Sequence, residues 1–211
     1  MYQFNGQYMK INSIYKRDEN KRIIIGDYAQ EEYKYLENNL WLGTEKIDGT
    51  NIRVSYDGET KALLFNGKTN DANTPQFLID KLHSMFNVDQ MDKIFSTAKV
   101  TLYGEGYGAK IQKGGGNYIP DGQSFILFDV VIDGWLLKRF DVVDLAYKLG
   151  IDTVKIIGEA TLLDWVEMIK SKTLKSVFGN FLAEGVVVTP IVDIFNRKGE
   201  RIITKIKHKD F

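Results

Sequence analysis

From residue 40 onward, the sequence is dominated by short runs of β-branched and aromatic residues that are separated by turn residues. Runs of this kind predict strands. Asp57-Gly58 and Asp133-Gly134 each lie between two apolar runs, which is the pattern of a hairpin turn. We therefore expect mainly antiparallel sheets. The predicted strands are LWLGTEK, TNIRVSY, KALLFN, KVTLYGE, SFILFDVVID, WLLKRF, TVKIIGE, EGVVVTP and RIITKIK.

Amphipathic segments between these runs predict helices. Gly150 follows one of them and is well placed to end it. Helices and strands do not alternate regularly along the chain, which argues against a doubly wound parallel sheet. The predicted fold class is α+β, with mainly antiparallel β-sheets flanked by helices. The predicted helices are QEEYKYLENN, TPQFLIDKLHSMF, VDQMDKIFSTA, RFDVVDLAYKLG and TLLDWVEMIKS.

Composition excludes several classes of protein. The formal net charge is +0, so any site for a polyanion must be a local patch. Cysteine is absent, which excludes disulfides, thiolate zinc sites and cysteine nucleophiles. No apolar run approaches the roughly 20 residues of a membrane span, and no signal peptide is recognisable. We expect a cytoplasmic protein with no membrane partner, folded as a single domain over residues 1–211, with an N-terminal segment at 1–39.

One glycine motif is misleading. Gly104-x-Gly106-x-x-Ala109 follows a predicted strand and matches the dinucleotide-binding fingerprint. That fingerprint requires a helix that opens at its glycines and holds a pyrophosphate. The following segment, KIQKGGGNYIPDG, contains too many glycines and a proline to form that helix. A nicotinamide-dependent enzyme is therefore not expected.

Charged residues interrupt several core-like strands. A buried carboxylate is costly unless it is paired, hydrogen-bonded or bound to a metal, so several such carboxylates indicate a common site. Lys46 ends a strand just before Asp48-Gly49, and a lysine amine is a nucleophile only when it is neutral. A further lysine pair near the end of the chain alternates on one strand, a pattern that is also typical of a solvated strand edge. The carboxylates are Glu105, Asp129 and Glu184, and the pair is Lys205 and Lys207.

The order Lys-x-Asp-Gly, Glu, Phe-Asp, Glu-Gly and Lys-x-Lys resembles the covalent nucleotidyltransferase superfamily of ligases and capping enzymes. Within it, the chain is most similar to ATP-dependent RNA ligases of the nick-sealing type found in phages and in RNA editing. The resemblance spans about residues 40–211 and implies a ligase-type adenylation domain. The segments that carry it are EKIDGTN, LYGEGYGAKIQKGGGNY, FILFDV, AEGVVV and TKIKHKDF.

This resemblance implies a reaction in three steps. Lys46 would attack the α-phosphate of ATP to form lysyl-AMP, AMP would pass to an RNA 5′-phosphate, and a 3′-hydroxyl would displace it to seal the strand. Glu184 would help hold Mg²⁺ (or Mn²⁺). Lys205 and Lys207 would grip phosphates and favour the neutral form of Lys46, and Asp129 would support the metal or Lys46.

The resemblance also implies nucleotide contacts. Phe128 would stack on adenine, and Glu105 would accept a hydrogen bond from a ribose hydroxyl. Glu45 would line the adenine pocket. Asn51 would act near the phosphate or the nick, at a position where DNA ligases usually carry arginine, which favours RNA over DNA.

The chain departs from the family pattern in two places. Lys68 occupies a position where relatives present an arginine, and a lysine cannot bind phosphate through two parallel hydrogen bonds. No C-terminal OB-fold or helical domain is expected, so an accessory protein is one source of further RNA contacts. RNA ends in a nicked or splinted duplex are the expected partner. The basic residues expected to help hold RNA are Lys16, Arg17, Lys21, Arg22 and Lys113.

Two other functions remain open from the sequence. One is a DNA ligase or an mRNA-capping nucleotidyltransferase, which shares the lysine chemistry. The other is a nucleotide- or RNA-binding module that has lost catalysis. A module without catalysis is expected to lack one of the chemical residues, whereas here only the arginine replaced by Lys68 departs from the pattern.

Overall fold

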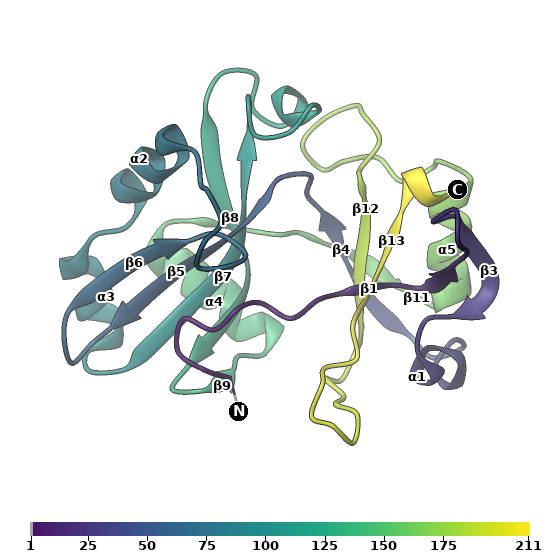
Figure 1. Ribbon diagram of the computed structural model, residues 1–211, viewed down its shortest axis with the longest axis horizontal. Helices are drawn as coiled ribbons and strands as arrows, with labels where there is room; N and C mark the ends of the chain where they lie inside the picture. Colours follow the sequence, from purple (N-terminus) through teal and green to yellow (C-terminus); the bar gives the residue numbers. More distant parts are fainter. Residues whose placement is uncertain (1) are drawn as a thin grey trace. The chain divides into compact units, whose positions relative to one another are not determined.

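The computed structural model describes residues 2–211, which form two compact units. Unit 1 comprises the N-terminal residues up to Met9 together with Asp48–Val154, and unit 2 comprises Lys10–Ile47 and Lys155–Phe211. The chain therefore passes between the units after Met9, after Ile47 (one residue beyond Lys46) and after Val154. Each unit has its own sheet and its own core (Figure 1).

Unit 1 contains a sheet of order β10-β8-β7-β5-β6, with the short β9 paired to β8 (Figure 1). All neighbours are antiparallel except β10 and β8. Its strands are β5 (Thr50–Asp57), β6 (Ala62–Asn66), β7 (Lys99–Gly108), β8 (Gln123–Ile132), β9 (Trp135–Leu136) and β10 (Asp152–Thr153). Its helices are α2 (Gln76–Met85), α3 (Val88–Phe95), α4 (Arg139–Leu149) and the 3₁₀ turn η1 (Gly115–Asn117).

The two faces of the unit 1 sheet are covered differently. Ile52, Val54 and Tyr56 alternate along β5 and pack into a core with α2, α3 and α4. The polar residues between them, Asn51, Arg53 and Ser55, face the other way. That polar face is crossed by the N-terminal segment, whose residues bond to it at several points. Arg53, Ser55, Thr101 and Tyr103 of this face therefore form hydrogen bonds to the N-terminal segment.

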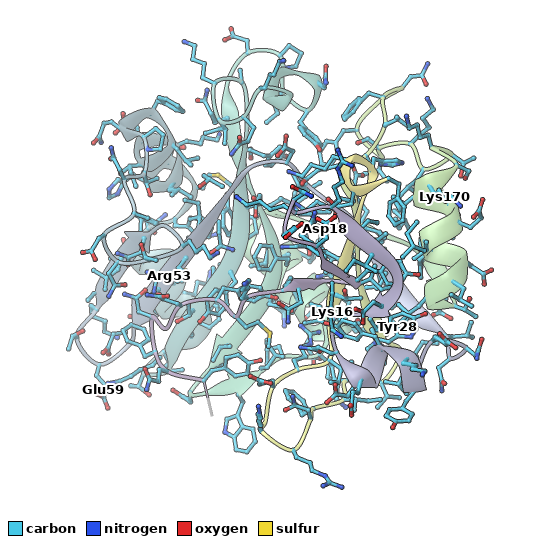
Figure 2. The ribbon with its side chains drawn as sticks, turned by 45° about the vertical axis from the view of Figure 1, so that its right-hand side comes forward. Lys16, Asp18, Tyr28, Arg53, Glu59 and Lys170 are labelled. Atoms are coloured by element: carbon cyan, nitrogen blue, oxygen red, sulfur yellow. The ribbon has the colours of Figure 1, made fainter. Side chains whose placement is uncertain are left out.

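Arg53 is fully buried on this polar face (Figure 2). Its Nε donates to the Gly67 carbonyl at 2.9 Å, and one terminal nitrogen donates to Asn70 Oδ1 at 2.8 Å. The other terminal nitrogen donates to the Asn5 carbonyl. A buried guanidinium is tolerated only when its donors are satisfied. Arg53 thus fixes both the N-terminal segment and the loop that carries Lys68.

Unit 2 contains a sheet of order β1-β13-β12-β4-β11 and a separate two-stranded ribbon, β2-β3 (Figure 1). All neighbours are antiparallel except β1 and β13. Its strands are β1 (Asn12–Ser13), β2 (Tyr15–Arg17), β3 (Ile23–Tyr28), β4 (Trp41–Lys46), β11 (Ile156–Ala160), β12 (Gly185–Pro190) and β13 (Thr204–Lys207). Its helices are α1 (Glu31–Tyr35), α5 (Leu162–Lys170) and the 3₁₀ turn η2 (His208–Asp210).

Helix α5 fixes the position of β4. Thr161 and Asp164 form a capping box that starts the helix. The Trp165 ring lies against Gly43, where a Cβ atom would come within 2.4 Å of it, and its indole nitrogen donates to the Trp41 carbonyl at 3.1 Å. A side chain at position 43 would push α5 off the strand. Glycine therefore permits the close packing that holds the strand ending at Lys46.

The expected fold class is confirmed: the fold is α+β with mainly antiparallel sheets. Both Asp-Gly hairpins are present, and Gly150 ends α4 in the left-handed conformation. Gly104 and Gly106 lie inside β7, where a Cβ would collide with Phe125 or Leu78, so they serve packing. No helix within residues 2–211 combines the length and the apolar character that crossing a membrane requires.

Several expected elements differ in extent. The helix expected at 30–39 is confined to Glu31–Tyr35, and the strand expected at 135–140 to Trp135–Leu136, because α4 begins at Arg139. The expected strand TVKIIGE is divided between β10 in unit 1 and β11 in unit 2. Periodicity cannot detect this division, since both halves carry the same apolar pattern.

Candidate active site

Three adjacent strands of unit 2 place Lys46 and Lys207 on either side of a glycine. In the register of the sheet, Lys46 of β4 is opposite Gly185 of β12, which in turn is opposite Lys207 of β13. A Cβ at Gly185 would lie 2.1 Å from the Ile206 carbonyl oxygen, so only glycine fits there. The two lysines thus occupy one row of the sheet with no side chain between them.

Glu184, the residue before β12, supplies the counter-charge for this row. Lys46 Nζ donates to Glu184 Oε2 at 2.6 Å, and Lys207 Nζ lies 3.3 Å from Glu184 Oε1. The three side chains are only 15–20% exposed. One carboxylate therefore holds two ammonium groups in a partly desolvated cluster, where electrostatic interactions are stronger than in water.

His208 fixes the backbone around Glu184. Its main-chain N–H donates to the Glu184 carbonyl at 3.1 Å, and its ring Nδ1 lies 2.7 Å from the Ala183 carbonyl oxygen. A carbonyl can only accept, so Nδ1 carries the hydrogen. No motif singles out this residue, because its contacts join the last strand to the loop before β12. His208 is a positioning residue that sequence reasoning missed.

Lys205 of β13 and Glu45 of β4 lie in the same sheet but outside the row of Lys46, Gly185 and Lys207. Lys205 lies two residues before Lys207 with the buried Ile206 between them, so both lysines share the partly exposed face of β13. Glu45 is buried on the opposite face of β4 from Lys46, and its Oε2 accepts a hydrogen bond from the Val177 N–H at 2.8 Å. The Glu45 side chain thus anchors the loop that leads to Glu184, while its other oxygen, Oε1, is buried with no hydrogen-bond partner within residues 2–211.

In unit 1, Asn51 and Glu105 are directly opposite each other on β5 and β7. Opposed residues of an antiparallel pair have Cβ atoms roughly 5 Å apart and lie on one face. Asn51 Oδ1 is buried and has no hydrogen-bond partner within residues 2–211. A Cβ at Gly49 would come within 2.7 Å of Glu105 Cγ, so the Asp48-Gly49 turn packs against this pair.

Phe128 is placed by a β-bulge. Tyr103 pairs with Asp129 and Gly104 with Leu127, which leaves Phe128 as the extra residue of β8. A bulge re-aims side chains, and Phe128 is half-buried between two buried neighbours. Its carbonyl accepts a hydrogen bond from Arg139 at 2.8 Å, which holds the bulge in place.

Tyr8 covers this bulge. Its ring lies 4.9 Å from the Phe128 ring and 5.0 Å from the Tyr103 ring, measured between centroids. Its hydroxyl donates to the buried Asp129 carboxylate. Tyr8 is the second residue that sequence reasoning missed, since it lies in a segment with no motif, and its contacts exist only because that segment crosses the sheet.

The basic residues expected to contact phosphate or RNA differ in whether they form ion pairs. Lys68 and Lys113 are exposed in loops of unit 1. The loop with Lys113 includes η1 and is tied to the Asp48-Gly49 turn by Gln112 and Tyr118. In unit 2, Lys16 is paired with Asp27 and Arg17 with Asp210. These two side chains already have counter-charges within the chain.

Glu184 is the acidic residue of the charged cluster in unit 2 that could hold a metal ion. Within residues 2–211 no three His, Asp or Glu side chains are grouped as a metal-binding set. Mg²⁺ is commonly held by one or two carboxylates together with substrate phosphates and water. Glu184, with two oxygens in a cluster of cations, fits an ion that arrives with a nucleotide and does not by itself form a closed metal cage.

Comparisons with known proteins identify the family of the chain. A family model for RNA ligases matches residues 39–207. No curated protein matches the chain. Among solved structures, Naegleria gruberi RNA ligase with PPi matches with a TM-score of 0.70 and 16% identity, over 99% of this chain and 57% of that one. A mutant of that ligase with AMP and Mn matches with a TM-score of 0.69 and 16% identity, over 100% of this chain and 60% of that one.

An archaeal ATP-dependent RNA ligase is also similar, with a TM-score of 0.64 and 13% identity over 97% of this chain and 49% of that one. The chain thus spans between about half and three fifths of the length of these ligases. At such identities the structures show a shared fold, whereas the family model covers most of the sequence. The chain belongs to the RNA ligase family.

Proposed function

We propose that the chain is an ATP-dependent RNA ligase of the nick-sealing type. Lys46 Nζ forms a bond to the α-phosphorus of ATP, the bond to the pyrophosphate oxygen breaks, and pyrophosphate leaves. AMP then moves to an RNA 5′-phosphate, and attack by a 3′-hydroxyl expels it and joins the strands. The observation that carries the proposal is the Lys46–Glu184–Lys207 cluster across β4, β12 and β13, in the segment that the family model matches.

The residues of unit 2 would act on phosphate. Lys46 must lose a proton before it attacks, and Glu184 already accepts one of its hydrogens at 2.6 Å. Lys207, together with Lys205 on the same face of β13, would neutralise phosphate charge, which is the main task in phosphoryl transfer. Glu184 would hold Mg²⁺, or Mn²⁺ as in a related ligase with AMP and Mn. The ion would supply charge stabilisation at the phosphates.

The residues of unit 1 would act on the nucleoside. Phe128 offers a half-buried ring for stacking on adenine, with Tyr8 and Asp129 fixing its surroundings. Glu105 would accept a hydrogen bond from a ribose hydroxyl. The free Oδ1 of Asn51 is an acceptor that a ligand can satisfy. Lys68 would contact phosphate from the loop that Arg53 holds.

Strand joining tests the proposal. The purified chain is incubated with Mg²⁺ and nicked duplexes that carry a labelled 5′-phosphate, made of RNA or of DNA, with ATP or GTP. We expect joined RNA with ATP and little joined DNA or GTP-driven product. Lys46→Ala should abolish joining, while Lys198→Ala, an exposed lysine of unit 2, should not. Preferred joining of DNA, or use of GTP, would support the alternative ligase or capping function.

A catalytically inactive binding module is the second alternative, and it predicts RNA or nucleotide binding without lysyl-AMP. The ordered Lys46–Glu184 contact argues against it, because a module without chemistry has no need to hold a lysine in a partly desolvated cluster. The accessory protein expected from the sequence stays a prediction.

A further inference from the structure

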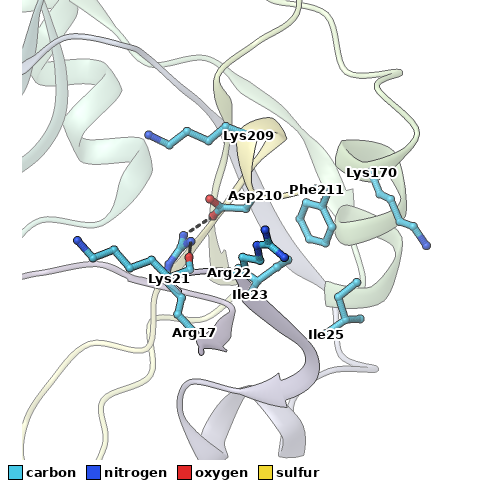
Figure 3. Close-up of a pocket in the computed structure, with 9 residues that line it drawn as sticks. All are labelled: Arg17, Lys21, Arg22, Ile23, Ile25, Lys170, Lys209, Asp210 and Phe211. Atoms are coloured by element: carbon cyan, nitrogen blue, oxygen red, sulfur yellow. Dashed lines mark hydrogen bonds and ion pairs between the residues drawn. The ribbon is translucent and has the colours of Figure 1, made fainter. Parts of the chain in front are cut away.

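A basic depression in unit 2 is not used by the proposed reaction. It has a volume of about 390 Å³ and is lined by the β2-β3 ribbon, the end of α5 and η2 (Figure 3). This volume falls within the usual range of ligand sites. Five of its lining residues are basic and one is acidic, although the whole chain has a formal net charge of +0. The charged residues are Arg17, Lys21, Arg22, Lys170, Lys209 and Asp210.

Only one of these cations has a counter-charge. Arg17 donates to Asp210 Oδ2 at 2.8 Å. The side chains of Lys21, Arg22, Lys170 and Lys209 make no ion pair or hydrogen bond with any described residue. Unpaired cations that gather on one surface repel one another and attract polyanions. Four cations of the depression therefore have no counter-charge among residues 2–211.

The Arg17–Asp210 pair connects the elements that form this surface. Besides Asp210, Arg17 donates to the Lys21 carbonyl at 2.8 Å, so it ties the tip of the ribbon to η2. Asp18 accepts a hydrogen bond from the Arg22 N–H at 2.8 Å and closes the turn. The basic side chains thus extend from a fixed frame, which lowers the entropy cost of binding.

Lys21 is in the left-handed region, with φ of 64°. Glycine or asparagine occupies such a position at lower cost, so the turn itself does not favour lysine. In Figure 3 the ammonium groups of Lys21 and Lys209 extend toward the same side of the Arg17–Asp210 pair, while Lys170 points away from them. These two ammonium groups come from two elements, the ribbon and η2, whereas the Arg22 guanidinium lies on the other side of the Arg17–Asp210 pair.

We propose that Lys21, Arg22 and Lys209 bind the phosphodiester backbone of an RNA strand. Lys209 is two residues beyond Lys207 and therefore within about 7 Å of it along the chain. Lys21, Arg22 and Lys209 are three separate cations, and several cations suit a chain of phosphates better than one isolated anion. The inference rests on the proposed function for the choice of RNA, and it assigns RNA contact to residues other than the paired Lys16 and Arg17.

The test measures RNA binding without ATP, so it reports on this surface even if no strand joining occurs. A fluorescein-labelled RNA oligonucleotide is titrated with the full chain and anisotropy is recorded over a range of salt concentrations. The test variant is K21E/R22E. The matched control is R197E/K198E, an exposed Arg-Lys pair of unit 2 outside the depression. Circular dichroism confirms that both variants are folded.

We expect K21E/R22E to weaken RNA binding about tenfold. The slope of log affinity against log salt should become shallower by roughly 0.7 for each phosphate that the variant no longer neutralises. K209E should act in the same direction, and R197E/K198E should stay within about twofold of the unchanged chain. Retained RNA affinity in K21E/R22E, or equal weakening in the control, overturns the proposal. So does weaker binding to anionic phospholipid vesicles with RNA affinity intact, which would assign the surface to a membrane.

Discussion

The two units hold their candidate residues in different ways. In unit 2, charged side chains satisfy one another: Glu184 lies between Lys46 and Lys207, and His208 fixes the backbone beside it. In unit 1, candidate residues are held by packing, since Tyr8 and Arg53 connect the sheet to a covering segment and a loop. A cluster of charges can be disabled by one substitution without unfolding, whereas a packed face tolerates the removal of a single side chain. The two units should therefore respond to substitution differently.

The largest effect is expected for Glu184→Ala. It removes the carboxylate that is proposed to hold Mg²⁺ and that accepts a hydrogen bond from Lys46, so lysyl-AMP formation should fall about 100-fold, the usual cost of removing one preorganised electrostatic contact. Labelled ATP with Mg²⁺ and a denaturing gel give the rate. Glu159→Ala, an exposed carboxylate on β11 of the same unit, is the control. An unchanged rate in Glu184→Ala would remove the cluster from the reaction.

A smaller effect is expected in unit 1 for Phe128→Ala. Loss of stacking on a base costs roughly 1–3 kcal/mol, so the KM for ATP should rise at least about fivefold while the denaturation midpoint changes little. Phe140→Ala removes a phenylalanine that is 81% exposed in the same unit and should leave KM unchanged. Equal behaviour of the two variants would mean that Phe128 does not meet the nucleotide.

His208→Ala tests whether unit 2 depends on the position of Glu184. Loss of one hydrogen bond, worth about 1 kcal/mol, should slow lysyl-AMP formation about fivefold. His208→Asn can still donate to the Ala183 carbonyl and should recover part of the rate. The other histidine of the chain, His83, packs against Phe65 in unit 1 and serves as the control. A purely structural role would change stability in both His208 variants and leave the rate of the folded fraction intact.

The smallest effect concerns one buried tyrosine in each unit. Burial raises the pKa of Tyr33 in unit 2 and of Tyr103 in unit 1 from 10.0 to about 12. Below pH 10 both hydroxyls are neutral in the folded and in the unfolded chain, so their contribution to the free energy of unfolding is fully present. Between pH 10 and about 12 the unfolded chain loses these protons first, so stability falls as pH rises.

Tyr33→Phe and Tyr103→Phe should each cost about 1 kcal/mol at neutral pH, because each removes one hydrogen bond to a carbonyl. Each should also make the stability of its unit less sensitive to alkaline pH. Urea unfolding followed by the fluorescence of the buried Trp41 and Trp165 reports on unit 2. An unaltered pH dependence of that transition in Tyr33→Phe would contradict the assignment.

The sequence predicted the grouping of candidate residues better in unit 2 than in unit 1. The order of Lys46, Glu184 and Lys207 along the chain indicated a shared site, and three neighbouring strands bring them together. In unit 1 the N-terminal segment covers the strand face that carries Asn51, Arg53 and Ser55. No local pattern reveals a contact between residues about fifty positions apart.

The basic ribbon shows a second limit of sequence reasoning. Lys16, Arg17, Lys21 and Arg22 have the same local charge pattern, so sequence provides no ground for separating them. Tertiary contacts do separate them: Asp27 and Asp210 neutralise Lys16 and Arg17, while Lys21 and Arg22 stay unpaired within the described chain. Asp210 is nearly two hundred residues away from Arg17, which puts this pairing beyond any local pattern.

The central claim is that the Lys46 amine bonds to the phosphorus of a nucleotide. Its most direct test is to incubate the chain with ATP and Mg²⁺, digest it, and locate the adenylate by mass spectrometry at alkaline pH, where a lysine phosphoramidate is stable. We predict one adenylate per chain, on the peptide that contains Lys46. An adenylate on another lysine, or an unmodified chain under conditions in which it joins RNA, would contradict the account.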